Sequence, residues 1–345
     1  MKTAQTTPAR RFAVLHQGAL GDFLLACPIF EDIHRTLPEV VMDFWTREDH
    51  ADLLISKPYI GEVASPHSRE LTAFHHDDLW EAADPPARFM DAYHVFIFGQ
   101  KGARLMSDRL SLRLSKPVHW IQSFPGPEDP VHVTEFLRRQ ISTILGPLKK
   151  GLHRLSPSPE HLNAARSWLK VQFGGGGPRP VLVHPGSGGA CKVWPLTRWY
   201  ALLKWLRQGL AVPVVLTLGP ADDRIRVLAR EASALGVRVA EGLSLPELAA
   251  LLSQARLFLG SDSGVSHLAA AVGTPTVVIF GCSDHRVWSP AGPHVQVVRD
   301  VWQESEVFDW PPDARQPLEN ESVKEIVVRW IQMGDKCTFR DASPG

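Results

Sequence analysis

Three short segments of the chain combine glycines with side chains that could hold a phosphate or move a proton. Residues 260–267 (Gly-Ser-Asp-Ser-Gly-Val-Ser-His) follow an apolar run and precede an alanine-rich run. A loop between the end of a strand and the start of a helix presents unpaired backbone N–H groups and the positive end of the helix dipole. Phosphate oxygens or sugar hydroxyls would bind there, so the candidates are Asp262, Ser263, Gly264 and His267. The alternative is that Asp262 only caps the helix and His267 only packs locally.

The second segment, residues 184–195, is rich in glycine and contains one lysine. Ser187, Gly188 and Gly189 would let backbone N–H groups approach a ligand, and Lys192 would add a point charge suited to a diphosphate. The segment is not a P-loop, because no Gly-Lys-Ser/Thr closes it, and it does not match GxGxxG. The alternative is a surface turn with a solvated lysine.

The third segment, residues 17–22 (Gln-Gly-Ala-Leu-Gly-Asp), stands in the equivalent place near the amino end. The carboxylate of Asp22 would face a cleft between domains and could take a proton from an acceptor hydroxyl. The alternative is an N-cap aspartate with no chemical role.

Composition limits the kinds of protein this can be. A chain of 345 residues with 44% hydrophobic and 21% charged residues is typical of a folded protein with two domains. Lys plus Arg and Asp plus Glu number 37 each, so no overall field favours nucleic acid.

Cysteine usage and hydropathy favour a cytoplasmic protein. The four cysteines, at 27, 191, 282 and 337, form no CxxC pair, which predicts neither a disulfide framework nor a zinc site. The first residues contain no apolar signal segment, and no run approaches the ~18 apolar residues of a membrane span. Peripheral contact with the inner face of the cytoplasmic membrane stays open, since the acceptor could be lipid-linked.

The elements that position these segments follow an alternating βα pattern. Strands are predicted at residues 12–16, 40–45, 94–98, 181–184, 214–218, 237–240, 257–260 and 276–280. Helices are predicted at 23–35, 134–148 with Thr134 as candidate cap, 160–173 and 322–333, and also starting near 196, 222, 244 and 263. The region from 101 to 120 is ambiguous. The fold class is therefore α/β with two doubly wound domains.

Turn-rich segments predict where the domains divide. We expect a first Rossmann-like domain over 11–155, a helical and Gly-rich connection over 156–179, and a second Rossmann-like domain over 180–320. The amphipathic helix at 321–334 is expected to pack back on the first domain.

Together the three segments resemble glycosyltransferase family nine, the bacterial lipopolysaccharide heptosyltransferases. The matching stretches are residues 21–28, 185–195 and 262–281, in the same order and spacing, whereas residues 50–130 have no recognisable counterpart. The resemblance implies a GT-B fold, whose two domains face each other across a cleft. The first would bind the acceptor and the second a nucleotide-sugar donor.

The resemblance also implies roles for individual residues. Asp22 would be the general base of an inverting, metal-independent transfer. Ser187, Gly188, Gly189 and Lys192 would hold the donor diphosphate, Asp262, Ser263, Gly264 and His267 would meet the sugar and phosphates, and Asp222 or Asp223 stands where the family usually has a ribose-contacting Glu. Gly21, Lys101 and Arg104 are the candidates for contact with the acceptor.

The expected reaction is transfer of heptose from ADP-heptose to a lipopolysaccharide core or related glycan, without a cofactor or metal ion. The alternatives are a family-nine enzyme with another nucleotide sugar or acceptor, and a catalytically silent GT-B binding module. An NAD-dependent oxidoreductase is disfavoured, because the chain lacks GxGxxG and a ribose-binding acid after a first strand.

Overall fold

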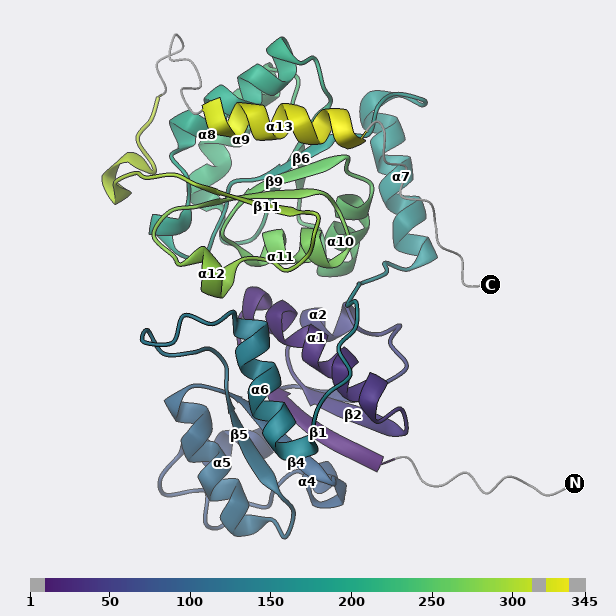
Figure 1. The fold of residues 1–345 in the computed structure, drawn as a ribbon, viewed down its shortest axis with the longest axis vertical. Coiled ribbons are helices and arrows are strands. Elements are labelled where there is room, and N and C mark those ends of the chain that lie inside the picture. The colour runs from purple at the N-terminus through teal and green to yellow at the C-terminus, as the bar shows by residue number, and fades with distance from the viewer. Residues whose placement is uncertain (1–9, 312–320, 335–345) are drawn as a thin grey trace, which may run out of the picture. The chain divides into compact units, whose positions relative to one another are not determined.

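The computed structural model describes residues 10–311 and 321–334. The chain forms two compact units that divide between His153 and Arg154, each built around one parallel β-sheet with helices on both faces (Figure 1). No helix in the described part is long and apolar enough to cross a membrane.

The first unit has a five-stranded sheet in the order β3-β2-β1-β4-β5. Its strands are β1 (Arg10–His16), β2 (Val40–Trp45), β3 (Ile60–Ala64), β4 (His94–Gly99) and β5 (Val118–Gln122). Its helices are α1 (Leu20–Thr36), α2 (Glu48–Asp52), α3 (Arg69–Thr72), α4 (Ala87–Asp91), α5 (Lys101–Arg113) and α6 (Val133–Leu145), with a 3-10 turn η1 (Ala73–His75). The chain reverses its winding direction between β1 and β4, and ligands of doubly wound sheets bind at the carboxyl ends of strands at such a point.

The second unit has a six-stranded sheet in the order β11-β10-β9-β6-β7-β8. Its strands are β6 (Val181–His184), β7 (Val214–Leu218), β8 (Arg238–Glu241), β9 (Leu257–Ser261), β10 (Thr276–Phe280) and β11 (Val295–Arg299). The corresponding reversal lies between β6 and β9, which pair in parallel. The loops after these two strands carry the glycine-rich segment and Asp262, so the fold brings them together.

The helices of the second unit cover both faces of its sheet. They are α7 (Pro159–Phe173), α8 (Leu196–Lys204), α9 (Arg226–Ala234), α10 (Leu245–Ser253), α11 (Gly264–Ala271), α12 (His285–Trp288) and α13 (Glu321–Gly334), with short turns η2 (Ala190–Lys192), η3 (Trp205–Gly209), η4 (Asp223–Ile225) and η5 (Glu304–Glu306). Helices α8, α9 and α13 lie on one side of the sheet, and α10 and α11 on the other (Figure 1).

The expectation that the last helix packs on the first domain was wrong. Val323 and Val327, one helical turn apart on α13, are fully buried in the core of the second unit. Arg256 also donates to the Ile331 carbonyl of α13 at 2.9 Å. The apolar stripe that suggested docking is therefore used within the second unit.

The cap predicted for α6 was also misplaced. The helix begins at Val133, and the side chain of His132 accepts from the backbone N–H of Thr134. Thr134 itself is buried, and its hydroxyl donates to the Leu25 carbonyl of α1 at 2.8 Å. It joins two helices instead of capping one.

Candidate functional site

In the second unit, the loops after β6 and β9 are joined by hydroxyl-to-carbonyl hydrogen bonds. The Ser187 hydroxyl donates to the Asp262 carbonyl at 2.6 Å, and the Ser261 hydroxyl donates to the Pro185 carbonyl at 2.7 Å. These bonds fix the glycine-rich loop against the start of α11. The structure thus brings together the two segments that sequence reasoning singled out in this unit.

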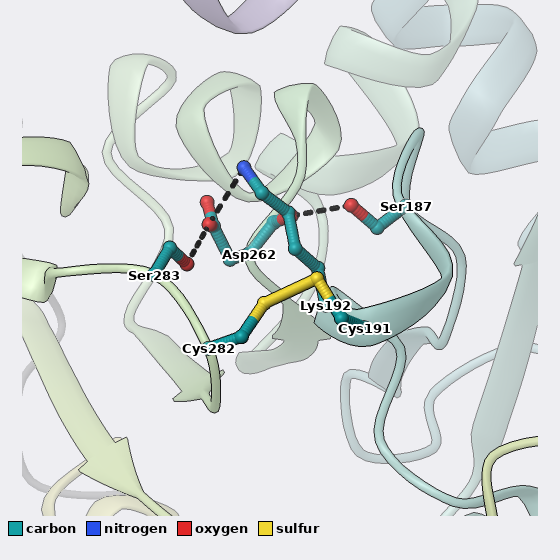
Figure 2. Close-up of a disulfide and its surroundings, with 6 residues drawn as sticks. All are labelled: Ser187, Cys191, Lys192, Asp262, Cys282 and Ser283. Atoms are coloured by element: carbon teal, nitrogen blue, oxygen red, sulfur yellow. Dashed lines mark hydrogen bonds and ion pairs between the residues drawn. A yellow bond between two sulfur atoms is a disulfide. The ribbon is translucent and has the colours of Figure 1, made fainter. Parts of the chain in front are cut away.

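The Asp262 carboxylate is the centre of this cluster (Figure 2). Its side chain is only 5% exposed, and its Oδ2 lies 3.0 Å from Lys192 Nζ. The same oxygen accepts a hydrogen bond from the Ser283 hydroxyl, which follows β10. An ammonium group has three N–H donors, so one bond to Asp262 leaves Lys192 able to bind a phosphate oxygen as well.

A disulfide joins Cys191 and Cys282 beside this cluster (Figure 2). The expectation that the cysteines form no disulfide was therefore wrong for this pair. The two residues are 91 positions apart, and a pairing between distant loops leaves no local spacing signal. Because Lys192 and Ser283 are their immediate neighbours, the bond fixes both partners of the Asp262 carboxylate.

The two candidate ribose contacts, Asp222 and Asp223, have different surroundings. Asp222 is buried, and its Oδ2 accepts from Gly219 N at 2.6 Å. Gly186 passes so close that a Cβ there would collide with the Asp222 carboxylate. Asp222 therefore packs against the glycine-rich loop and supports it. Asp223 is exposed and forms an ion pair with Arg226 at 3.0 Å.

A buried histidine lies under the same loop. His184 Nε2 is 4.0 Å from Asp222 Oδ2, and its Nδ1 lies 3.1 Å from the Thr217 carbonyl. Burial lowers the pKa of His184, and the nearby Asp222 opposes that effect. We therefore treat His184 as part of the support of the loop.

The start of α11 supplies further polar groups at the same edge. Ser263 occupies the N-cap position, and its hydroxyl has no hydrogen-bond partner among the described residues. Gly264 is the first residue of the helix, and His267 is 7% exposed one turn later. The free hydroxyl and the unpaired N–H groups of this helix terminus suit an anion.

In the first unit, Asp22 occupies the third position of α1. The N-cap is Ala19, and Asp22 Oδ2 accepts from Ala19 N at 3.3 Å. The interpretation of Asp22 as an N-cap was therefore wrong, because the helix starts two residues earlier. Gly18 lies against it, since a Cβ at Gly18 would be 2.9 Å from the Asp22 Cβ.

A cavity of about 1060 Å³ opens beside this loop at the carboxyl ends of β1, β2 and β3. It is lined by the β1–α1 loop at residues 17–19, by residues that follow β2 and by residues 63–67 around the end of β3. Lys101 and Arg104 do not line it. They begin α5 after β4, and Arg104 stacks 5.2 Å from the centre of the Trp120 ring.

Comparison with known proteins shows what the chain is similar to. Residues 149–310 match the model of glycosyltransferase family 9 (heptosyltransferase). A lipopolysaccharide heptosyltransferase 3 of Escherichia coli is 25% identical over 317 residues, which cover 86% of this chain and 87% of the relative. Residues 149–310 therefore match glycosyltransferase family 9, and the chain over most of its length resembles a lipopolysaccharide heptosyltransferase.

Solved structures show which fold the chain has. A family 9 glycosyltransferase from Veillonella parvula DSM 2008 superposes with a TM-score of 0.70 at 17% identity, over 96% of this chain and 99% of that one. The E. coli ADP-heptose lipopolysaccharide heptosyltransferase II gives 0.66 at 18% identity, over 94% and 99%. The protein has the GT-B fold, as the sequence predicted, and its curated relatives support a glycosyltransferase.

Sequence reasoning missed two features of the protein. Ser283 contacts Asp262, but a lone serine after a strand gives no signal until the sheet places it beside β9. The cavity of the first unit lies within the stretch, residues 50–130, that lacked a recognisable pattern, together with the loops before it. Short, half-exposed elements such as β3 form much of its wall.

Proposed function

We propose that this protein transfers heptose from ADP-heptose to a hydroxyl of a lipopolysaccharide core or related glycan. The observation that carries the proposal is the cluster of Lys192, Asp262 and Ser187 at the point where the winding of the second sheet reverses. A cation beside a helix N-terminus is suited to a nucleotide diphosphate. The names of the E. coli relatives, which include ADP-heptose and lipopolysaccharide, support the choice of sugar and acceptor.

In the proposed reaction, an acceptor hydroxyl attacks the anomeric carbon from the face opposite the diphosphate. The bond from that carbon to the β-phosphate oxygen breaks as the new glycosidic bond forms, so the configuration inverts. Asp22 takes the proton of the attacking hydroxyl. Lys192 and the first N–H groups of α11 stabilise the negative charge that develops on the departing ADP.

The donor-binding roles divide among the residues of the second unit. The loop after β6 presents backbone and hydroxyl groups to the donor through Ser187, Gly188 and Gly189. The start of α11 adds Ser263, Gly264 and His267. The Asp222 carboxylate already accepts the Gly219 N–H, so the exposed Asp223 is the better candidate for a ribose hydroxyl. Gly21, Lys101 and Arg104 stay as predicted acceptor contacts outside the cavity.

Nucleotide selectivity tests the donor side of the proposal. ADP should raise the melting temperature more than UDP, GDP or NAD, because a ligand that binds only the folded state stabilises it in proportion to its affinity. Transfer of heptose from ADP-heptose to a core oligosaccharide, followed by mass spectrometry, tests the reaction itself. Selective ADP binding without transfer or hydrolysis would favour a silent binding module.

Transfer should not require a divalent cation, because Lys192 and the α11 terminus can supply the positive charge at the diphosphate. Activity in excess EDTA should stay within about twofold of the untreated enzyme. Loss of activity with EDTA, restored by Mg²⁺ or Mn²⁺, would contradict this.

A lipid-linked acceptor would also bring the enzyme to the membrane, which co-sedimentation with acceptor-containing vesicles would detect.

A further inference from the structure

The cavity of the first unit has the position expected of a binding site next to Asp22. The backbone of Gly18 and Ala19 forms part of its wall, and Ala19 N donates to the Asp22 carboxylate. A ligand in the cavity would therefore lie against the loop that carries the proposed general base. At about 1060 Å³ the cavity has room for one or two sugar residues.

An unpartnered polar group in the wall independently indicates a ligand. Thr46 lines the cavity directly after β2 and is only 1% exposed. Its hydroxyl has no hydrogen-bond partner among the described residues. Buried hydroxyls are nearly always hydrogen-bonded, so this one is suited to a sugar hydroxyl.

Exposed apolar side chains form another part of the wall. Ile55 and Val63 are 76% and 41% exposed, although both line the cavity. Small-molecule sites combine such apolar surface with a few directed polar groups. The C–H face of a sugar ring fits this combination.

The charges around the cavity are mostly negative. Glu48, Asp49 and Asp52 line it, whereas Arg47 is the only Arg or Lys side chain that lines it among the described residues. The Arg47 guanidinium is already bound to both oxygens of Asp49, at 3.0 and 2.8 Å. The pKa of Arg47 is raised, mainly by this hydrogen bonding to Asp49. An anionic ligand could use Arg47 only by displacing Asp49, and would then face three carboxylates.

We propose that this cavity binds the acceptor through an uncharged sugar residue, and that its carboxylates select against a residue carrying phosphate or a carboxylate. The inference rests on the proposed function, because it concerns the acceptor of that reaction. It names the chemical class of the sugar that meets Asp22. Glu48 and Asp52 are then the specificity-determining residues, since neither is tied to Arg47 by a hydrogen bond in the structure.

Binding of a matched pair of glycans to the full chain tests the charge selection. The probes are a neutral heptose disaccharide, as its methyl glycoside, and the same disaccharide with one phosphate, measured by calorimetry at low salt. The neutral probe should bind at least about tenfold more tightly, and the difference should shrink with added salt. Replacing the carboxylates, as Glu48→Gln with Asp52→Asn, should reduce the difference to about threefold or less. Asp108→Asn, an exposed carboxylate of α5 that does not line the cavity, is the control.

A second pair of variants tests the location. Ile55→Trp should weaken binding of the neutral disaccharide at least about fivefold by narrowing the cavity. Leu112→Trp is the matched control, because Leu112 is 75% exposed on α5 and does not line the cavity. Unchanged binding with Ile55→Trp would place the glycan elsewhere and overturn the inference.

The donor side separates failure of this inference from failure of the proposed function. If ADP-heptose binds and heptose is transferred, but the phosphorylated glycan is equal or preferred, only the charge selection is wrong. If ADP-heptose binds and neither disaccharide does, the cavity is not the acceptor site. If ADP-heptose does not bind at all, the proposed function itself fails.

Discussion

At the scale of single residues, Lys192 has two roles, one towards Asp262 and one towards the donor diphosphate. It neutralises the buried Asp262 carboxylate in the structure, and it is proposed to hold the donor diphosphate. Lys192→Ala should weaken ADP binding by about 1.5 to 3 kcal/mol, the usual value of a charge-assisted contact. It should also lower the free energy of unfolding by about 1 to 3 kcal/mol, because Asp262 loses its counter-charge.

A double variant separates these two effects. Lys192→Ala combined with Asp262→Asn removes the unpaired carboxylate, so most of the stability should return while ADP binding stays weak. Lys170→Ala, an exposed lysine of α7, is the control. If calorimetry gives ADP affinity near that of the wild type for the double variant, Lys192 serves only Asp262.

Asp22 is expected to act on the reaction far more than on the fold. Asp22→Asn keeps the side-chain shape but removes the proton acceptor, so turnover should fall by about 10² to 10⁴. The free energy of unfolding should drop by no more than about 1 kcal/mol, from the lost charge near the start of α1. Steady-state turnover measures the effect on the reaction, and melting temperature measures the effect on stability. Asp91→Asn, at an exposed position, is the control. Nearly full turnover would remove Asp22 from the mechanism.

At the scale of elements, the Cys191–Cys282 bond connects the turn before α8 to the loop after β10. Closing a segment of 91 residues should raise the free energy of unfolding by about 2 to 4 kcal/mol. Reduction with dithiothreitol should therefore lower the melting temperature and weaken ADP binding, since the partners of Asp262 are no longer held together. The variant with both cysteines replaced by alanine should not respond to the reductant. Equal melting of oxidised and reduced wild type would contradict this prediction.

Element prediction succeeded where strands are buried on both faces. Strands such as β1 and β9 are almost continuous apolar runs, and their positions were predicted closely. The missed strands, β3, β5 and β11, lie at sheet edges or are only half-buried, so their sequences lack such a run. Residues 101–120 stayed ambiguous because α5 buries only a few side chains, among them Met106 and Leu110.

At the scale of the whole molecule, buried histidines predict loss of stability in acid. Burial, with a smaller contribution from the neighbouring His50, lowers the pKa of His16 to about 3. The unfolded chain binds a proton at this residue near its ordinary pKa of about 6.5, whereas the folded chain does not. The stability associated with neutral His16 is therefore fully present above pH ~6.5 and falls by about 1.4 kcal/mol per pH unit below it. His119 and His153, both with a pKa lowered to about 4, act in the same direction.

Urea unfolding at pH 7, 6 and 5 would measure this dependence. A His16→Leu variant should show a pH slope smaller by about 1 kcal/mol per unit, whatever its stability at pH 7. His67→Leu, at an exposed histidine of the same unit, is the control. An unchanged slope in His16→Leu would show that His16 takes up its proton in the folded protein as well.

The sequence predicted only those residues of the candidate site that lie in loops after central strands. The alternation of strands and helices was enough to place Lys192, Asp262 and Asp22 at carboxyl ends of strands. It was not enough to show that Lys192 binds Asp262, or that Cys191 meets Cys282, because both contacts depend on how β6, β9 and β10 are ordered in the sheet. The cavity depends on exposed side chains such as Ile55, which follow no period.

The same cysteine bond changes how the molecule would respond to mechanical force. Strands β7, β8, β9 and β10 all lie between Cys191 and Cys282, so tension applied to the chain ends would pass through the sulfur atoms and bypass these strands. A pulled chain would then extend about 300 Å less when oxidised than when reduced, the length of the enclosed 91 residues. Optical-tweezer traces with and without reductant would show this hidden length directly.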